Sequence, residues 1–328
     1  MNLLEALRYL AALDQHRHFG RAAMACRITQ PALSNAIRAL ETELGVPVVR
    51  RSRQYEGLTS EGEVVLAHAH RLLREAEAMR QELHSREDAP RGRLQIGAVP
   101  TAIPVAAQFA AQLRTLQPGL EPVLRSLSSP EIEIGLENLS LDLALGYTGR
   151  AQVIARHMEI WPQYEEAYYL VRRGAAARDE PQLDAAACDE PQLDAAARDE
   201  PIAWRDAAAL PLVMLTPEMH NRSIVEGAMR SAGAAVKPAL ETNSVLALIA
   251  ALGDGTLSAV MPGALLQVAK GLQGLHLRPL IDPVVRTPIG FMSAATPRAT
   301  PALRAAHALA HDAQWLAQLS GAAERGVG

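Results

Sequence analysis

The chain has 328 residues, of which 49% are hydrophobic, 21% are charged and only two are cysteines. This length is enough for two or three domains with sizeable cores, and two cysteines are too few for a disulfide framework or a thiolate metal site. The net charge of −4 argues against a chain that binds nucleic acid over its whole surface.

The charge is unevenly distributed along the chain. Residues 1–58 hold eight arginines and five acidic residues, a net charge of +3, so the remainder carries −7. A basic head on an acidic body fits a DNA-binding module joined to another domain, although chance variation of a mixed surface is the alternative. The N-terminal segment lacks the apolar core and cleavage site of a signal peptide. No later run approaches the ~18 apolar residues of a membrane span, so we expect a cytoplasmic protein with no membrane partner.

Three short helices are predicted first, over residues 2–16, 20–27 and 30–44, with a tight turn between the last two. This spacing is typical of a helix-turn-helix. In the third helix Leu33, Ile37, Leu40 and Leu44 form one apolar stripe. Thr29 is the expected N-cap and Gly45 the expected stop. A second, polar face is suited to the major groove and carries Gln30, Pro31, Ser34, Asn35 and Arg38.

A small basic hairpin is predicted next, pairing Val48–Arg50 with Gly57–Thr59. Arg50, Arg51 and Arg53 lie near its tip. A basic hairpin after a helix-turn-helix is a wing that reaches phosphates or the minor groove. Residues 1–59 are therefore predicted to form a winged helix-turn-helix domain, mostly α-helical.

Residues 60–88 are predicted to form a long linker helix that is capped by Thr59 and Ser60, with Ser60-x-x-Glu63 as a capping box. Its apolar residues recur at alternating spacings of four and three, which is typical of a helix–helix seam between two chains. These residues are Val65, Ala69, Leu72, Ala76, Met79 and Leu83. The alternative is an amphipathic helix that lies on its own domain. Residues 85–93 break the helix pattern, and we expect a hinge at 89–93.

From residue 93 the pattern becomes α/β. Strands are predicted at 94–99, 121–127, 141–147, 210–216, 237–242, 257–262, 275–281 and 287–294. Helical segments alternate with them, the first two at 104–116 and 130–138, so we expect mostly parallel sheets. The α/β region that begins at residue 93 is long for one such domain, so we expect two lobes. Lobe I is predicted from residues 94–164 together with about 277–320, and lobe II from residues 165–276.

Residues 175–201 contain a ten-residue unit repeated with a single Arg-to-Cys change, at Cys188. Two copies are too few for a solenoid. We interpret residues 178–197 as a recent insertion into a surface loop, with no function of its own.

The N-terminal segments together resemble those of the LysR-type transcriptional regulators. The resemblance rests on Ala22-Ala23, on Gln30-Pro31-Ala32-Leu33-Ser34, on Ile37-x-x-Leu40-Glu41 and on Leu58-Thr59-x-x-Gly62. Later markers are Leu141-Asp142-Leu143-Ala144, Gly253-x-Gly255 and Met261-Pro262. The chain departs from the family at Val48-Val49, where Leu-Phe is usual, and at His18, where a small polar residue is usual.

This resemblance implies a bacterial regulator that binds promoter DNA as a homodimer or homotetramer and contacts RNA polymerase. It also implies a C-terminal region like a type 2 periplasmic binding protein, with a small effector in the cleft between two lobes. The residues point to the same cleft, because several helices start directly after strands, where parallel α/β sheets bind ligands. The candidate effector-binding residues are Thr101, Ser128, Ser129, Asn221, Arg222 and Asn243. Free N–H groups at helix starts favour an anion, so a small carboxylate is expected; the alternative for each Ser, Thr or Asn is an ordinary N-cap.

An enzyme, or a ligand-binding protein with an accessory helix-turn-helix, is the main competing interpretation. The sequence has no phosphate loop, no nucleophile elbow and no His/Cys cluster with metal-ligand spacing. Glu165-Glu166 is interpreted as a solvated pair rather than a catalytic one. We therefore expect no catalytic residue, no metal and no cofactor.

Overall fold

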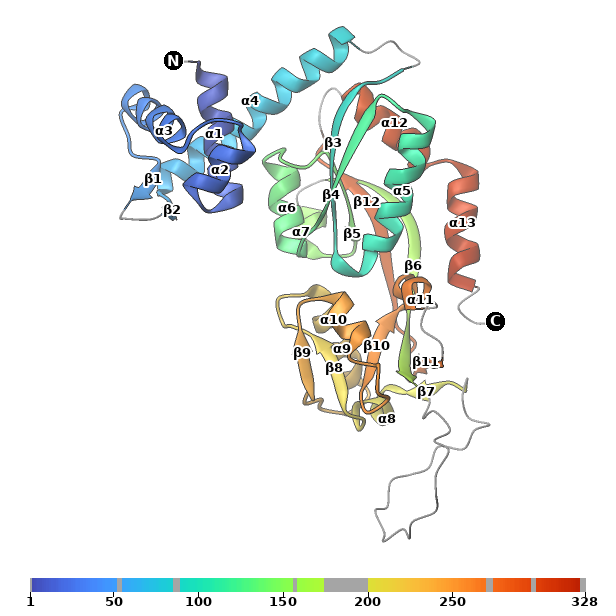
Figure 1. The fold of residues 1–328 in the computed structure, drawn as a ribbon. Helices are drawn as coiled ribbons and strands as arrows, with labels where there is room; N and C mark the ends of the chain where they lie inside the picture. Colours follow the sequence, from blue (N-terminus) through green and yellow to red (C-terminus); the bar gives the residue numbers. More distant parts are fainter. Residues whose placement is uncertain are drawn as a thin grey trace.

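The computed structural model describes residues 2–51, 55–84, 89–155, 158–173, 200–269, 274–295 and 299–324. The predicted insertion at 178–197 and the wing residue Arg53 lie outside these ranges. The chain forms a small helical head, one long helix and an elongated α/β body (Figure 1). No helix within the described ranges is long and apolar enough to cross a bilayer.

The head contains the three predicted helices, α1 (Leu3–His16), α2 (Phe19–Ala25) and α3 (Gln30–Leu44). Leu10, Leu13, Leu33, Ile37 and Leu40 are fully buried in their common core. Leu44, predicted as the end of the buried stripe, is instead exposed, because it lies on the last turn before Gly45 closes the helix at a φ of +72°.

The wing and the start of the long helix are shifted relative to the prediction. The hairpin pairs β1 (Val49–Arg51) with β2 (Tyr55–Leu58), so Thr59 is not part of it. The Thr59 hydroxyl donates to the Pro47 carbonyl at 2.7 Å and accepts from the Gly62 N–H at 2.9 Å. Thr59 is therefore the N-cap of α4 (Ser60–His84), as predicted. The predicted box at Ser60 is wrong, because the Ser60 hydroxyl donates to Glu61 instead.

Helix α4 packs along α1 with its N-terminal half and reaches the α/β body with its C-terminal half (Figure 1). Ala69 is fully buried in the core of the head and Val65 packs against that core. These two residues of the predicted seam therefore serve the chain's own domain, which was the alternative interpretation. Leu72, Met79 and Leu83 are 47%, 57% and 74% exposed, and Ala76 is half-buried.

The body contains one mixed ten-stranded sheet, with the strand order β4-β3-β5-β12-β6-β10-β8-β9; β11 pairs with β6, and β7 pairs with β11. The eight predicted strands are β3 (Gly92–Ala98), β4 (Leu120–Ser126), β5 (Leu143–Tyr147), β8 (Leu212–Leu215), β9 (Leu240–Thr242), β10 (Ser258–Pro262), β11 (Leu275–Ile281) and β12 (Arg286–Ser293). Two strands were not predicted, β6 (Glu159–Arg173) and β7 (Ile202–Ala203). The sheet is less parallel than expected, because β6 runs antiparallel to β12, β10 and β11.

Strand β6 connects the two lobes. Residues 159–167 pair with β12 in lobe I, and residues 168–173 pair with β10 and β11 in lobe II. The predicted boundary at 164/165 thus falls inside a strand. The chain was predicted to return from lobe II to lobe I near residue 277, which is too early. Strand β11 still pairs with the lobe II part of β6 and with β7, and the chain re-enters lobe I only with β12. The predicted hinge at 89–93 overlaps β3, which begins at Gly92.

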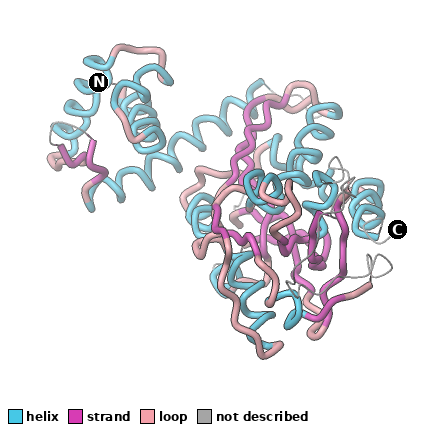
Figure 2. The backbone as a smooth tube through the Cα atoms, turned by 60° about the horizontal axis from the view of Figure 1, so that its bottom comes forward, coloured by secondary structure: helices cyan, strands magenta, loops and turns pink. Residues whose placement is uncertain are grey.

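Helices cover both faces of this sheet (Figure 2). Lobe I carries the 3-10 helix η1 (Pro100–Ala102) and the helices α5 (Ile103–Leu116), α6 (Ser129–Glu137), α7 (Ala151–Ala155), α12 (Pro301–Ala310) and α13 (Ala313–Glu324). Lobe II carries α8 (Trp204–Ala208), α9 (His220–Ser231), α10 (Val245–Ala250) and α11 (Gly263–Ala269). The starts of η1, α6 and α9 meet where the lobes face each other.

Candidate DNA-reading head and effector cavity

The polar face of α3 is available to a partner. Gln30, Pro31, Asn35 and Arg38 are exposed and Ser34 is half-buried, while the opposite face of the helix forms the core of the head. The Thr29 hydroxyl accepts from the Ala32 N–H at 3.4 Å and fixes the helix start, as predicted. Among the described residues no ion pair restrains the Arg38 guanidinium, which leaves its donors available.

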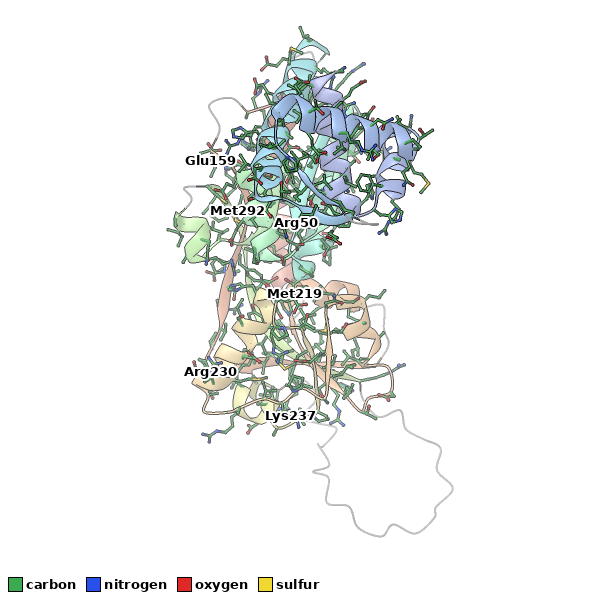
Figure 3. The ribbon with its side chains drawn as sticks, turned by 90° about the vertical axis from the view of Figure 1, so that its left-hand side faces the viewer. Arg50, Glu159, Met219, Arg230, Lys237 and Met292 are labelled. Atoms are coloured by element: carbon green, nitrogen blue, oxygen red, sulfur yellow. The ribbon has the colours of Figure 1, made fainter. Side chains whose placement is uncertain are left out.

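The wing presents Arg50 on the same head (Figure 3), exposed to solvent. Arg51 ends β1 and Arg53 lies outside the described residues. Of the three predicted wing arginines, Arg50 is therefore the one whose side chain the structure describes.

A small cavity lies between the lobes; we call it the interlobe cavity. It encloses about 220 Å³, part of it open to solvent. Met219 belongs to its lobe II wall and lies near the boundary between the lobes in Figure 3. Four predicted effector residues line it together with six that were not predicted: Thr101, Ser128, Ser129 and Asn221, then Val99, Pro100, Tyr147, Leu215, Met219 and His220.

Two buried polar side chains of this cavity each keep an atom that is not fully satisfied. Ser129 is 4% exposed and Asn221 is 6% exposed, and among the described residues neither Ser129 Oγ nor Asn221 Nδ2 has a hydrogen-bond partner. The Thr101 and Tyr147 hydroxyls bond to each other at 3.0 Å. Ser128 is the ordinary cap that the alternative interpretation expected, because it forms a capping box with Glu131, whose carboxylate accepts from the Ser128 N–H at 2.8 Å and from its hydroxyl at 2.7 Å.

Two predicted residues do not reach the cavity. Arg222 is buried in lobe II, where it pairs with Glu226 and Glu241 at 2.7 Å each and donates to the Leu215 carbonyl. It holds β9 against α9 and supplies no charge to the cavity. Asn243 is exposed, and the cap of α10 is Ser244, whose hydroxyl accepts from the Ala247 N–H.

His220 was not predicted, although it lies in the cavity wall at the start of α9. Arg150 of lobe I bonds to Glu133 at 2.6 Å and to His220 Nδ1 at 2.9 Å. A guanidinium only donates, so His220 Nδ1 must accept and Nε2 must carry the proton. Burial, with the Arg150 charge as the second cause, lowers the pKa of His220. His220 is therefore a neutral hydrogen-bond donor, and its contact with Arg150 joins the lobes.

The interpretation of Glu165-Glu166 as a solvated pair is half wrong. Glu165 is exposed, but Glu166 points to the other face of β6 and is 1% exposed. Burial raises the pKa of Glu166 to about 8, and the Tyr164 hydroxyl opposes this rise. Glu166 is therefore mostly protonated at neutral pH.

Comparisons with known proteins match both parts of the chain. The model "Bacterial regulatory helix-turn-helix protein, lysR family" matches residues 4–63, and the model "LysR substrate binding domain" matches residues 87–315. The chain belongs to the LysR family. The second match covers most of the α/β body, so membership rests on the whole architecture of this LysR-family protein and not on the head alone.

Relatives of this LysR-family protein include a "Hydrogen peroxide-inducible genes activator" of Dickeya chrysanthemi, 36% identical over 146 residues. That match covers 44% of this chain and 48% of the relative, so the chain spans about half the length of this relative. A "Probable hydrogen peroxide-inducible genes activator" of Mycobacterium xenopi is 32% identical over 51% of this chain and 87% of the relative.

Solved structures agree in fold. Full-length OxyR C199D from Pseudomonas aeruginosa has a TM-score of 0.65 and 24% identity, over 96% of this chain and 95% of that one. Full-length CbnR in complex with its target DNA has a TM-score of 0.61 and 19% identity, over 96% of this chain and 99% of that one. At these identities the likeness concerns the fold alone.

Proposed function

We propose that this LysR-family protein is a bacterial transcriptional regulator that binds promoter DNA in the cytoplasm, under the control of a small effector, and that it is not an enzyme. The observation that carries the proposal is the exposed polar face of α3, since the opposite face of that helix is fully used in the core. Direct readout needs such a face, because bases are recognised by hydrogen bonds in the major groove. The wing arginines are proposed to contact phosphates or the minor groove.

The proposed effector is a small organic anion bound in the interlobe cavity. The lining offers donors, namely the Ser129 hydroxyl, the Asn221 amide and the N–H of His220. An oxygen-rich ligand would satisfy these donors, and the N-terminus of α6 favours negative charge. The ten lining residues include no cysteine, so we propose reversible binding without covalent chemistry, although several relatives are named for hydrogen peroxide.

The active form is proposed to be a homodimer or homotetramer joined through the exposed part of α4, and RNA polymerase is the further partner expected of an activator. Leu72, Met79 and Leu83 are the apolar residues of the predicted seam that remain exposed in a single chain. Pairing them across two chains would place two heads on a two-fold-related DNA site.

Gel-shift titration with DNA from upstream of the protein's own gene, at two salt concentrations, tests the DNA-binding proposal. Arg38→Ala should cost about 1–3 kcal/mol and relax sequence preference. Arg50→Ala should weaken all sequences similarly and flatten the salt dependence. Arg8→Ala, which removes an exposed arginine from α1, is the matched control. If Arg38→Ala bound operator and random DNA as the parent does, α3 would not be the reading helix.

Ser129→Ala and Thr101→Val test the effector site. Each should weaken the rise in melting temperature caused by small carboxylates, with acetate and oxalate as the first probes, and each should leave effector-free DNA binding intact. Asn243→Ala is the control, because that residue is exposed and does not line the cavity. Loss of DNA binding in the absence of any probe would instead identify Ser129 and Thr101 as structural residues.

A further inference from the structure

A second, larger pocket lies between the lobes on the strands that connect them; we call it the β6 pocket. It spans about 600 Å³, part of it open to solvent. Its walls come from α5 and α13 of lobe I, from α11 of lobe II and from β6 and β12. None of the six predicted effector residues lines it.

Most of this wall is apolar. Val105, Tyr169, Ala264 and Leu319 contribute hydrocarbon or aromatic surface from four different elements. Arg286 also lines the pocket, but it is exposed, so solvent and salt screen its charge. A ligand with a short apolar body fits such walls.

Glu166 is the unusual member of the lining. It is 1% exposed, and among the described residues the buried Tyr164 hydroxyl is the one group that hydrogen-bonds to it, too loosely to satisfy either carboxyl oxygen. A buried carboxyl with so weak a partner is costly in either protonation state. The residues that interact with it electrostatically are the tyrosines Tyr147, Tyr164 and Tyr168. Within the part of the chain that the structure describes, no lysine or arginine is among the groups that shift the Glu166 pKa.

We propose that the β6 pocket is a second ligand site and that it binds an organic ammonium ion with a short apolar body, with Glu166 as the counterion. An ammonium group would give the two carboxyl oxygens their missing donors and a compensating charge. The walls from both lobes would enclose the apolar body. The proposal does not depend on the identity of the anion in the interlobe cavity.

The binding step includes a proton. Burial holds the pKa of Glu166 at about 8, so near neutral pH the carboxyl must lose its proton to solvent as the ammonium ion binds. The facing hydroxyls of Tyr147, Tyr164 and Tyr168 stay neutral throughout, because burial raises the pKa of each tyrosine. The charged residues Arg286 and Glu165 of the same lining are exposed. The apparent affinity should therefore rise about tenfold per pH unit below pH 8 and level off above it, until a primary amine itself loses its proton near pH 10.

Isothermal titration and thermal unfolding of the full chain with n-butylammonium, butyrate and n-butanol test this proposal. These probes share one apolar body and differ in charge. We expect n-butylammonium to raise the melting temperature and to bind at least tenfold more tightly than the other two. Titrations in two buffers of different ionisation enthalpy should show release of up to one proton per ligand at pH 7.

Three variants identify the counterion. Glu166→Gln keeps the shape of the protonated carboxyl, so it should fold, and it should lose at least tenfold in affinity for n-butylammonium together with the pH dependence. Glu165→Gln removes the same charge from the exposed neighbour and should change the affinity less than twofold. Ala264→Leu narrows the pocket without a change of charge and should also weaken binding. Equal binding of butyrate, absence of n-butylammonium binding to the parent, or parental affinity in Glu166→Gln would each overturn the proposal.

Discussion

His18 illustrates how a single side chain fixes the start of a helix in the DNA-binding head. Its Nδ1 accepts from the Gly20 N–H at 3.0 Å and from the Arg21 N–H at 3.3 Å, so the ring replaces the usual small polar cap of α2. His18→Ala should destabilise the head by about 1 kcal/mol, measured by urea unfolding. His18→Asn, which can also cap, should stay close to the parent; an equal loss in both variants would mean that the ring acts through packing.

Some residues of the interlobe cavity could be predicted from the sequence, because they lie where a helix starts directly after a strand. Thr101, Ser129 and Asn221 follow strands at the starts of helices, and this order of elements can be recognised in sequence. Arg222 is one residue further along α9, and a step of about 100° around the helix turns it into the lobe. The burial of Glu166 depends on α11 and α13 packing against β6, and no local pattern contains that information.

At the scale of elements, α4 is attached to lobe I by a partly buried ion pair between Arg74 and Asp142, close to the start of β5. Asp142 also accepts from the Gln95 N–H. Tyr147, at the other end of β5, lines the interlobe cavity, so one strand joins the cavity to the helix that carries the head. Arg74→Ala would leave the Asp142 carboxylate without its cation. We expect a loss below the about 3–5 kcal/mol typical of fully buried pairs, measured by chemical unfolding at pH 7.

The pH dependence separates this loss from a simple loss of packing. Burial raises the pKa of Asp142, and Arg74 opposes that rise, so removal of Arg74 moves the pKa further up. The folded variant then binds more protons than the unfolded chain above pH ~4, and its stability falls as pH rises through that window. The difference from the parent should shrink on acidification from pH 7 toward pH 4. A difference that stays constant with pH would contradict an electrostatic role.

Helices and strands could be predicted from the sequence where the hydrophobic periodicity and the capping residues lie within the element itself. Helices α1 to α3 and eight strands lie within a few residues of their predicted ranges. Strand β6 was missed because Pro162 and the charged Glu165-Glu166 interrupt the pattern of a buried strand. Its pairing with β12 is irregular near Gln163, which accommodates the interruption. Only the partner strands, far away in sequence, stabilise the extended conformation there.

At the scale of the whole molecule, the exposed stripe on α4 predicts assembly. Leu72→Glu combined with Met79→Glu would place charges in a seam between two chains, so sedimentation should show a smaller species. The matched control is Val64→Glu, which charges an apolar residue of α4 that is 60% exposed and outside the seam. An unchanged oligomer in the double variant would show that the chains associate through another surface.

The passage of β6 through both lobes limits how this protein can be divided or recombined. A fragment that starts at residue 165 would begin in the middle of a strand and leave unpaired backbone along β12, an edge prone to aggregation. A chimera in which lobe II comes from a relative would need two matched junctions, one in β6 and one before β12, both in register. Exchange of ligand specificity by transplanting a lobe is therefore harder here than exchange by substitutions within the cavity walls.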